Sequence, residues 1–379
     1  MRSSHKGLAL ERQLRPFSAR RLTFFTGVSL FGVGVVAPIL MRTTHRTVEE
    51  AAQLDRPISV VITAYREAGI IGDTVARLCE QLKNAAEVDA RIIVVASDHE
   101  TADAAEAAGA TTLRVPREGK ARALNRGVEA ATGKLVVLTD ANASLGDGWP
   151  ARVREGLKHA HLISGVKHET GGAEQAFWQL ERLIKSSKVS SASRVESLSV
   201  VGELLAFRSE DFAPFERDHL SDDLALAASF DRRGKRVLID RALVALEPAT
   251  TGVAQWERRI RIAEGQYREV LPRLRDYVAT PAGRTYLVHK MYRLTVGVFG
   301  FWLAILSLLV ARSPWSMVVV PLLVGGSVAH YTRAPGRGGQ LLTTLSTAVS
   351  LQVVPIVSLS RLFRSRNRAK EPGWKKVAR

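Results

Sequence analysis

The chain has 379 residues, a net charge of +17 at pH 7 and one cysteine, Cys79. One cysteine excludes an intrachain disulfide, which fits a reduced, cytoplasmic compartment. The positive charge suits an anionic partner, and Arg and Lys gather beside long apolar runs, so an acidic lipid surface is favoured over nucleic acid, for which we find no motif.

Residues 1–55 form a basic N-terminus around an apolar segment, Thr23–Met41. The segment has close to the ~20 residues that a membrane-spanning helix needs. No small-residue cleavage site follows it, so we interpret it as an anchor rather than a signal peptide. A buried helix and a re-entrant or interfacial helix remain alternatives, since Gly32, Gly34 and Pro38 permit a break.

Residues 56–280 alternate short β-branched runs with helical patterns. The predicted strands are Ile58–Thr63, Arg91–Ala96, Thr111–Val115 and Lys134–Thr139, and the predicted helices are Ile70–Leu82, Thr101–Ala108 and Ala121–Ala131. Strands separated by such helices form βαβ units and a mostly parallel sheet. Ligands of such sheets bind at the carboxyl ends of the strands, so the residues after each strand indicate function.

Polar residues follow the predicted strands and open one of the helices. They are Thr63, Tyr65 and Glu67 after the first strand, Asp98 after the second, Lys120 at a helix start, and Asp140 and Asn142 after the fourth. An aromatic ring, carboxylates and an ammonium group suit a nucleoside diphosphate. The chain has no Walker loop and no Gly-x-Gly-x-x-Gly after the first strand, which argues against a dinucleotide oxidoreductase.

The second half of this region carries an acid pair and basic helices. Asp222 and Asp223 open a predicted helix that ends at Asp231, and an N-cap role is an alternative for at least one of them. The segment Glu174–Lys188 reads as an amphipathic helix that faces an acceptor or packs in the core. Basic interfacial helices are expected over residues 253–280.

Membrane helices are expected over residues 290–360, followed by a basic tail at 361–379. Leu294–Ala311 and Pro314–Tyr331 are spanning candidates, joined by a turn at Arg312–Ser313. Leu341–Ser360 is a weaker candidate, because Gln352 and Pro355 interrupt it.

The order of these motifs resembles the family 2 glycosyltransferases with a GT-A fold. The motifs are Thr-Ala-Tyr-Arg-Glu, Ser-Asp, Gly-Lys-x-x-Ala-Leu-Asn-x-Gly, Asp-Ala-Asn and Ser-Asp-Asp-Leu, and the likeness runs from Pro57 to about Val270. Within the family, the chain is similar to membrane-bound enzymes of cellulose, hyaluronan and succinoglycan synthesis. The resemblance implies an α/β domain with a Rossmann-like mixed sheet, membrane helices and inverting transfer of a sugar.

The resemblance also implies roles for single residues. Tyr65 and Glu67 would contact the nucleoside, Asp98 the uracil, and Lys120 would lie near the base; Thr63 opens the first motif where the family commonly has Pro. Asp140 and Asn142 would hold Mg²⁺ or Mn²⁺. Asp223 would be the catalytic base, with Asp222 capping the helix or orienting the site.

Two departures from the family pattern bear on function. Asn142 stands where Asp is usual, so the metal site lacks one negative charge, and Asn142→Asp is expected from the sequence to tighten the metal. Processive members carry Gln-x-x-Arg-Trp, whereas here Gln255 and Arg258 are followed by Arg259. This change argues against processive extrusion, and we expect Arg258 or Arg259 to contact a phosphate.

These observations predict a plasma-membrane enzyme that transfers a sugar from a nucleotide-sugar, expected to be a UDP-sugar, to a lipid-linked or saccharide acceptor in cell-surface polysaccharide or glycolipid synthesis. A processive polysaccharide synthase and a non-catalytic membrane scaffold with a nucleotide pocket are the alternatives. Nucleotide-sugars require a cytoplasmic catalytic domain, yet both basic ends also favour the cytoplasm. We therefore expect two C-terminal spans, with segments 23–41 and 341–360 embedded without crossing.

Overall fold

The computed structural model describes residues 19–40, 56–170, 194–216, 219–248, 252–310, 314, 317–318 and 351–364. The chain contacts divide it into an apolar unit (1–40 and 288–355) and an α/β unit (41–287 and 356–379). The predictions for Glu174–Lys188, for most of Pro314–Tyr331 and for residues 341–350 lie outside the described residues.

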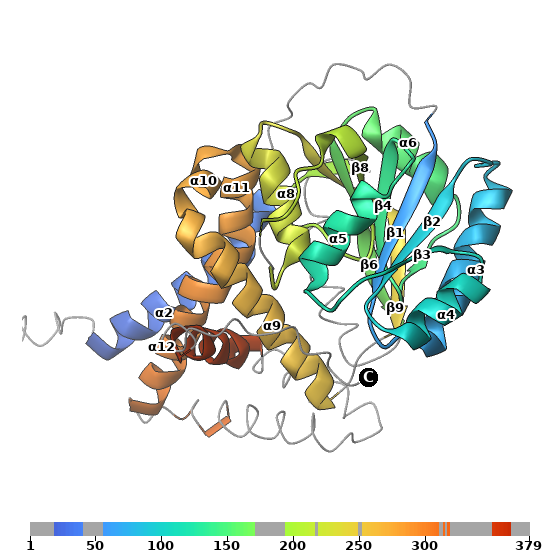
Figure 1. Cartoon of the computed structure of the whole chain (residues 1–379). Helices are drawn as coiled ribbons and strands as arrows, with labels where there is room; N and C mark the ends of the chain where they lie inside the picture. The colour runs from blue at the N-terminus through green and yellow to red at the C-terminus, as the bar shows by residue number, and fades with distance from the viewer. Residues whose placement is uncertain are drawn as a thin grey trace, which may run out of the picture. The chain divides into compact units, whose positions relative to one another are not determined.

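The α/β unit is built on a mixed sheet with nine strands in the described residues, in the order β3-β2-β1-β4-β8-β6-β9-β5 with β7 paired to β9 (Figure 1). The first half is parallel, as predicted, and the second half adds antiparallel pairs through β8, β5 and β7. The strands are β1 (Ile58–Ala64), β2 (Arg91–Ala96), β3 (Thr111–Arg114), β4 (Leu135–Asp140), β5 (Ser144–Leu145), β6 (Leu162–Thr170), β7 (Arg194–Glu196), β8 (Leu205–Arg208) and β9 (Val237–Pro248).

Helices cover both faces of the sheet. They are α3 (Ala68–Asn84), α4 (His99–Ala107), α5 (Lys120–Glu129) and α6 (Trp149–Leu157). Alternate β1 residues point to opposite faces: Val60 belongs to the core shared with α3, α4 and α6, and Val61 faces α5. A Cβ at Gly127 of α5 would lie 2.3 Å from Val61 Cγ1, so only glycine allows α5 to lie this close to β1.

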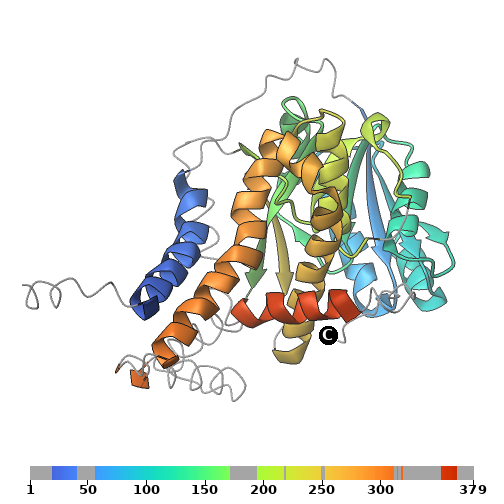
Figure 2. The same cartoon turned by 90° about the vertical axis from the view of Figure 1, so that its left-hand side faces the viewer.

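Further helices of the α/β unit follow β8 in the chain. They are the 3₁₀ turn η1 (Ser209–Asp211), α8 (Asp222–Arg232), α9 (Gly252–Val270), η2 (Leu271–Arg273), α10 (Leu274–Ala279) and α11 (Pro281–Tyr286). Residues 351–364 form a further helix, red in Figure 2. Arg361 pairs with both carboxylate oxygens of Glu257 at 2.8 and 2.9 Å, and Ser358 Oγ donates to the Ile260 carbonyl, so residues 358–361 pack on α9.

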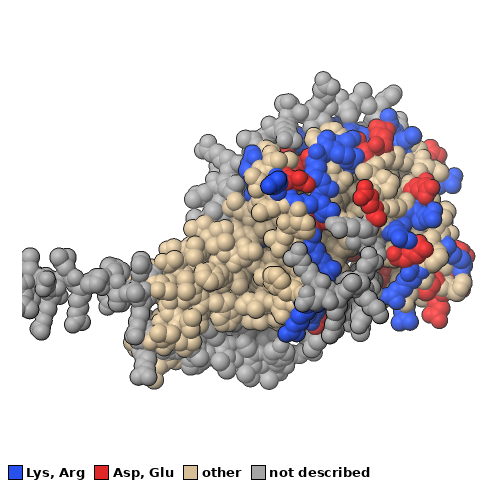
Figure 3. All heavy atoms as spheres, turned by 60° about the vertical axis from the view of Figure 1, so that its left-hand side comes forward, with Lys and Arg blue, Asp and Glu red and all other residues tan. Residues whose placement is uncertain are grey.

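The apolar unit contains α2 (Ala19–Leu40) and the helix that continues through the π-helical turns η3 (Leu287–Met291) and η4 (Arg293–Gly297) into α12 (Val298–Val310). In the described part of the chain, one helix, Pro281–Val310, is long and apolar enough to cross a membrane, and Thr23–Val33 is a shorter apolar stretch. In Figure 3 the visible Lys, Arg, Asp and Glu side chains gather on the α/β unit.

The helices α2 and α12 pack against each other in opposite directions. Gly27 lies against Gly300 and Ala304, while Leu30, one turn later in α2, lies against Gly300. The Leu30 carbonyl also accepts a hydrogen bond from Tyr292 at 3.0 Å, further toward the start of the partner helix. The chain directions are therefore antiparallel, and the two glycines allow close backbone approach, as in membrane helix pairs.

Candidate active site

The carboxyl ends of β1, β2 and β4 meet at one edge of the sheet. In the parallel register, Thr63 of β1 lies opposite Asp140 of β4 on one side and Val95 of β2 on the other. Tyr65 and Asp98 follow directly after β1 and β2. The structure thus brings the predicted nucleotide-side residues to the edge at which parallel sheets bind ligands.

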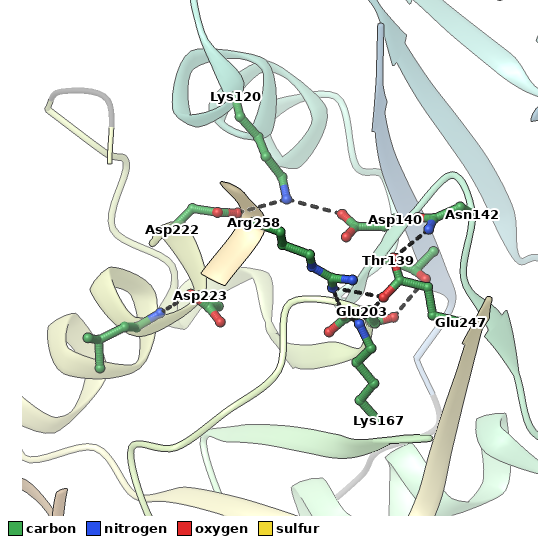
Figure 4. A network of polar contacts seen from close by, with 11 residues as sticks. Lys120, Thr139, Asp140, Asn142, Lys167, Glu203, Asp222, Asp223, Glu247 and Arg258 are labelled. Carbon is green, nitrogen blue, oxygen red and sulfur yellow. Dashed lines mark hydrogen bonds and ion pairs between the residues drawn. The ribbon is translucent and has the colours of Figure 1, made fainter. Parts of the chain in front are cut away.

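Lys120 links this edge to the acid pair. Its Nζ lies 3.1 Å from Asp140 Oδ1 and 3.1 Å from Asp222 Oδ2 (Figure 4). Burial opposes the charge of Lys120, but the two carboxylates outweigh it and raise the pKa of the ammonium group. The side chain therefore remains a cation between a β4 carboxylate and an α8 carboxylate.

Asp223 has a different environment from Asp222. Its Oδ1 accepts hydrogen bonds from Ser221 Oγ at 2.8 Å and from the Leu224 amide at 2.7 Å, and in the described residues no cation lies within ion-pair distance of it. Burial, followed by the negative charge of Asp222, raises the pKa of Asp223 to about 6. Ser221, rather than either aspartate, occupies the N-cap position of α8 and makes no capping hydrogen bond, while Asp223 Oδ1 accepts from an amide of the first turn.

A buried ionic network lies next to the Asp140 motif and was not predicted from the sequence. Glu247, at the end of β9, is 1% exposed; it pairs with Lys167 and accepts from Arg258 Nη2 at 2.8 Å. Glu203 Oε1 contacts the same two cations, at 3.1 Å for Lys167 and 3.2 Å for Arg258. Asn142 Nδ2 donates to Glu247 Oε1 at 2.6 Å, which joins the β4 motif to the network.

In the described residues, this network pairs two carboxylates with two cations. Burial raises the pKa of Glu203 and outweighs the lowering effect of Lys167. Burial by itself raises the pKa of Glu247, but Arg258 and Lys167 outweigh it and lower that pKa to about 2. Thr139 Oγ1 also donates to the Glu203 carbonyl at 2.8 Å, which holds that segment against β4.

On the nucleoside side, Asp98 holds the loop between β1 and α3. Its Oδ1 accepts from the Thr101 amide at 2.9 Å and caps α4, and its Oδ2 accepts from the Arg66 amide at 2.6 Å. The Glu67 amide donates to Thr101 Oγ1 at 2.9 Å. Arg117 lies 4.2 Å from the ring centroid of Tyr65, so this ring already carries a cation on its face.

Helix α9 carries Gln255 and the two arginines that are expected to contact a phosphate or the acceptor. Gln255 is buried, Arg258 joins the ionic network and Arg259 is half-buried. Arg261 lies one turn after Arg258. Burial lowers the pKa of its guanidinium group, and the nearby charges of Asp222, Asp140 and Asp223 offset part of this effect. Helix α9 thus directs positive charge at the acid pair as well as at Glu247.

Asp140 and Asn142 provide oxygen donors of the kind that Mg²⁺ and Mn²⁺ accept. They lie two residues apart at the end of β4, and in the described residues no cluster of three or more His, Cys, Asp or Glu side chains could hold a metal by itself. The donor set therefore fits an ion that shares its coordination with the phosphates of a ligand, rather than an all-protein cage.

The sequence did not predict the roles of Lys167, Glu203 and Glu247, because their neighbours in the sequence do not indicate an ionic network. Lys167 and Glu247 are 80 residues apart, and Asn142 and Glu247 are 105 apart. Glu203 is buried, but nothing in its sequence neighbours indicates this. Only the pairing of β6 with β9, which sets His168 beside Leu246, brings Lys167 and Glu247 together.

Comparison with known proteins adds to this geometry. Residues 59–224 match the model of the family "Glycosyl transferase family 2". The poly-β-1,6-N-acetyl-D-glucosamine synthase of Staphylococcus aureus strain COL is 23% identical over 203 residues, which cover 50% of this chain and 48% of the synthase. The chain thus spans about half the length of the curated relatives it matches.

A solved structure supports the fold. A mannosyltransferase of Pyrobaculum calidifontis, solved with GDP-Man and Mn²⁺, superposes with a TM-score of 0.64 at 20% identity and covers 92% of this chain and 99% of its own. The sheet order and this superposition confirm the predicted α/β fold with a mixed sheet. Residues 59–224 therefore belong to a family 2 glycosyltransferase domain with the GT-A fold.

Proposed function

We propose that the protein is an inverting glycosyltransferase that moves a sugar from a nucleotide-sugar to the hydroxyl of a lipid-linked or saccharide acceptor. The observation that carries the proposal is the acid pair. Lys120 neutralises Asp222, while Asp223, with a raised pKa and no paired cation in the described residues, retains the basicity needed to accept a proton. Lys120 pairs with Asp222 and also with Asp140 at the end of β4, so the acid pair lies close to the carboxyl edge of the sheet.

Asp223 is the general base of this reaction. An acceptor hydroxyl is a poor nucleophile, and a positioned carboxylate contributes about 10²- to 10⁴-fold by removing its proton in the transition state. A base pKa of about 6 lies near a neutral working pH, where the group is ionised and still basic. Attack from the base side, opposite the leaving diphosphate, inverts the anomeric carbon.

Asp140, Asn142 and Lys120 serve the donor diphosphate. Asp140 and the carbonyl oxygen of Asn142 would hold Mg²⁺ or Mn²⁺, which would neutralise charge on the leaving diphosphate when bound. Lys120 adds a fixed positive charge beside Asp140. Arg258 and Arg259 of α9 remain candidates for phosphate or acceptor contacts.

Tyr65, Glu67 and Asp98 are proposed to bind the nucleoside, with UDP-sugars as the expected donors. The motif resemblance supports UDP, and the Staphylococcus aureus relative is named for a product made of N-acetyl-D-glucosamine. The solved mannosyltransferase holds GDP-Man, so GDP-sugars are the competing donors in the test below.

We also propose that α2 and the Pro281–Val310 helix both cross the cytoplasmic membrane. Antiparallel packing of α2 on α12 puts the end of α2 and the start of the partner helix, which both connect to the catalytic domain, on the same side of the membrane, and 22 residues of α2 reach roughly 33 Å. This proposal replaces the expectation from the sequence that segment 23–41 embeds without crossing. Phe25, Phe299 and Leu306 are exposed apolar side chains of these helices, which suits lipid contact. The N-terminus then lies outside, against its charge bias.

Donor hydrolysis and product length test the function. Purified membranes containing the protein should release UDP from one of UDP-glucose, UDP-galactose or UDP-GlcNAc, and Asp223→Asn membranes should not. Release of GDP from GDP-mannose alone would correct the donor, and no release with any donor would favour the scaffold alternative. A single added sugar is expected; long products would establish the processive alternative.

A further inference from the structure

The hydrogen bond between Asn142 and Glu247 indicates a role for Glu247, which belongs to none of the sequence motifs described above. Asn142 follows Asp140 by two residues, and its amide nitrogen donates to Glu247 Oε1 at 2.6 Å (Figure 4). Glu247 is buried and belongs to β9, which is far from β4 in the sequence. The amide of Asn142 is thus held from outside its own loop.

The contact determines which atom of Asn142 is available to a ligand. A side-chain amide has one donor end and one acceptor end. Glu247 accepts from Arg258 and pairs with Lys167, and a carboxylate held by two cations only accepts, so the nitrogen of Asn142 faces it and the carbonyl oxygen is left for other partners. An oxygen fixed in this way beside Asp140 has the chemistry of a neutral cation ligand.

Glu247 is itself fixed. Its second oxygen accepts from Arg258 at 2.8 Å and pairs with Lys167, and Glu203 balances the same two cations. In the described residues, two carboxylates already share these two cations, so a carboxylate at position 142 would face the like charge of Glu247 across the distance of the present hydrogen bond. A buried, uncompensated charge is strongly unfavourable.

We propose that Glu247 is the positioning residue of the Asp-Ala-Asn motif: it orients Asn142 so that the carbonyl oxygen is presented beside Asp140 to the divalent ion, and its charge is the reason that position 142 carries an amide. The inference rests on the proposed metal-assisted function. The sequence alone leads to the opposite expectation for Asn142→Asp, because it does not show Glu247.

Relocating one charge tests this role. Asn142→Asp should lower the melting temperature and weaken Mn²⁺ binding by about 10- to 100-fold, the usual effect of disturbing a residue that orients a metal ligand. In the double variant Asn142→Asp/Glu247→Gln, the Gln amide can donate to Asp and its oxygen can face Arg258 and Lys167. The number of charges returns to that of the parent, so stability and Mn²⁺ affinity should both recover.

The experiment uses the full chain purified in detergent. Mn²⁺ binding is followed by the EPR signal of free Mn²⁺ in the presence of whichever nucleoside diphosphate, UDP or GDP, the parent binds better. Asn84→Asp is the matched control, since it adds one carboxylate at an exposed position of α3 and should change neither quantity.

The outcomes separate the roles. Tighter Mn²⁺ binding in Asn142→Asp at an unchanged melting temperature would overturn the inference. Recovery of stability without recovery of Mn²⁺ affinity would reduce Glu247 to a structural residue. If the single variant does not fold, the double variant decides, because only a charge-relocation effect lets it fold and bind Mn²⁺. A parent that binds no Mn²⁺ would refute the proposed metal use itself, whereas an active, Mn²⁺-binding parent without rescue would refute this inference alone.

Discussion

Ser221 donates its hydroxyl hydrogen to Asp223 across 2.8 Å, and so the residue at the N-cap position of α8 serves the acid pair instead of the helix end. This bond favours the ionised form of Asp223 and limits the rise of its pKa that burial and Asp222 cause. Two sequence neighbours, Asp222 and Ser221, therefore shift the pKa of the proposed base in opposite directions, in addition to the larger effect of burial.

Asp223→Asn should abolish sugar transfer while changing nucleotide and metal affinity by no more than a few-fold. The amide keeps the size and can still accept from Ser221 and Leu224, but it cannot take the acceptor proton. Transfer and UDP binding are measured side by side for Asp223→Asn and the matched Asp222→Asn. Near-parent transfer in the first with none in the second would mean that Asp222 is the base.

The pH dependence of transfer should show one acid limb near pH 6. Asp223 must be ionised to act as a base, so kcat/KM should fall tenfold per pH unit below the pKa of about 6 and level off above it. Ser221→Ala removes a hydrogen bond that lowers this pKa, so the limb should move to higher pH. A limb that stays in place in Ser221→Ala would exclude Asp223 as the titrating group.

Chelation should stop transfer. Asp140 and Asn142 supply too few ligands to hold an ion tightly without a phosphate ligand, so EDTA should remove it readily and Mn²⁺ or Mg²⁺ should restore activity. Initial rates in EDTA, and after adding back each ion, provide the measurement. Full activity in EDTA would remove the metal from the mechanism and leave Lys120 as the proposed cation at the diphosphate.

Asp98→Ala should weaken UDP binding and also lower the melting temperature. The sequence predicts the first effect only, with the fold left intact. The structure adds the second, because Asp98 caps α4 and holds the Arg66 amide, and loss of such a cap costs about 0.5–2 kcal/mol. Calorimetry with UDP and GDP on the parent and the variant measures the selectivity. Tighter binding of GDP by the parent would replace uridine in the proposal.

The membrane arrangement can be read from thiol accessibility, since Cys79 is the only native cysteine and lies exposed on the α/β unit. In intact cells, an impermeant maleimide should leave Cys79 unlabelled and should label a Cys introduced by Ser3→Cys in a Cys79→Ser background. Lysed cells, in which both should react, serve as the control. Protection of both positions in intact cells would place the N-terminus in the cytoplasm, as its charge suggests.

The parallel half of the sheet could be predicted from sequence because its signals are local. The run from Arg91 to Ala96 gives β2 with the predicted bounds, and β1 and β4 each differ by a residue. Thr63 and Asp140, at strand ends, could therefore be assigned to one edge before their register was seen.

The second half could not be predicted in this way. Strand β8 enters between β4 and β6 in antiparallel orientation, and nothing in the four residues Leu205–Arg208 encodes that position. The same holds for Glu247, whose role depends on partners from β4, β6 and α9. Buried charges are satisfied by tertiary neighbours, which are distant in the sequence.

The close contact of Gly127 with Val61 fixes the position of α5, and with it the position of Lys120. The backbone of the helix at Gly127 rests on the side chains of Val61 and Val95, and its first residue, Lys120, carries the ammonium group that joins Asp140 to Asp222. A methyl group at position 127 would tilt or lift the helix at a point about 10 Å along its axis from Lys120. The alignment of Lys120 with Asp140 and Asp222 is thus sensitive to the packing of α5 on β1, which lies away from the proposed substrate site.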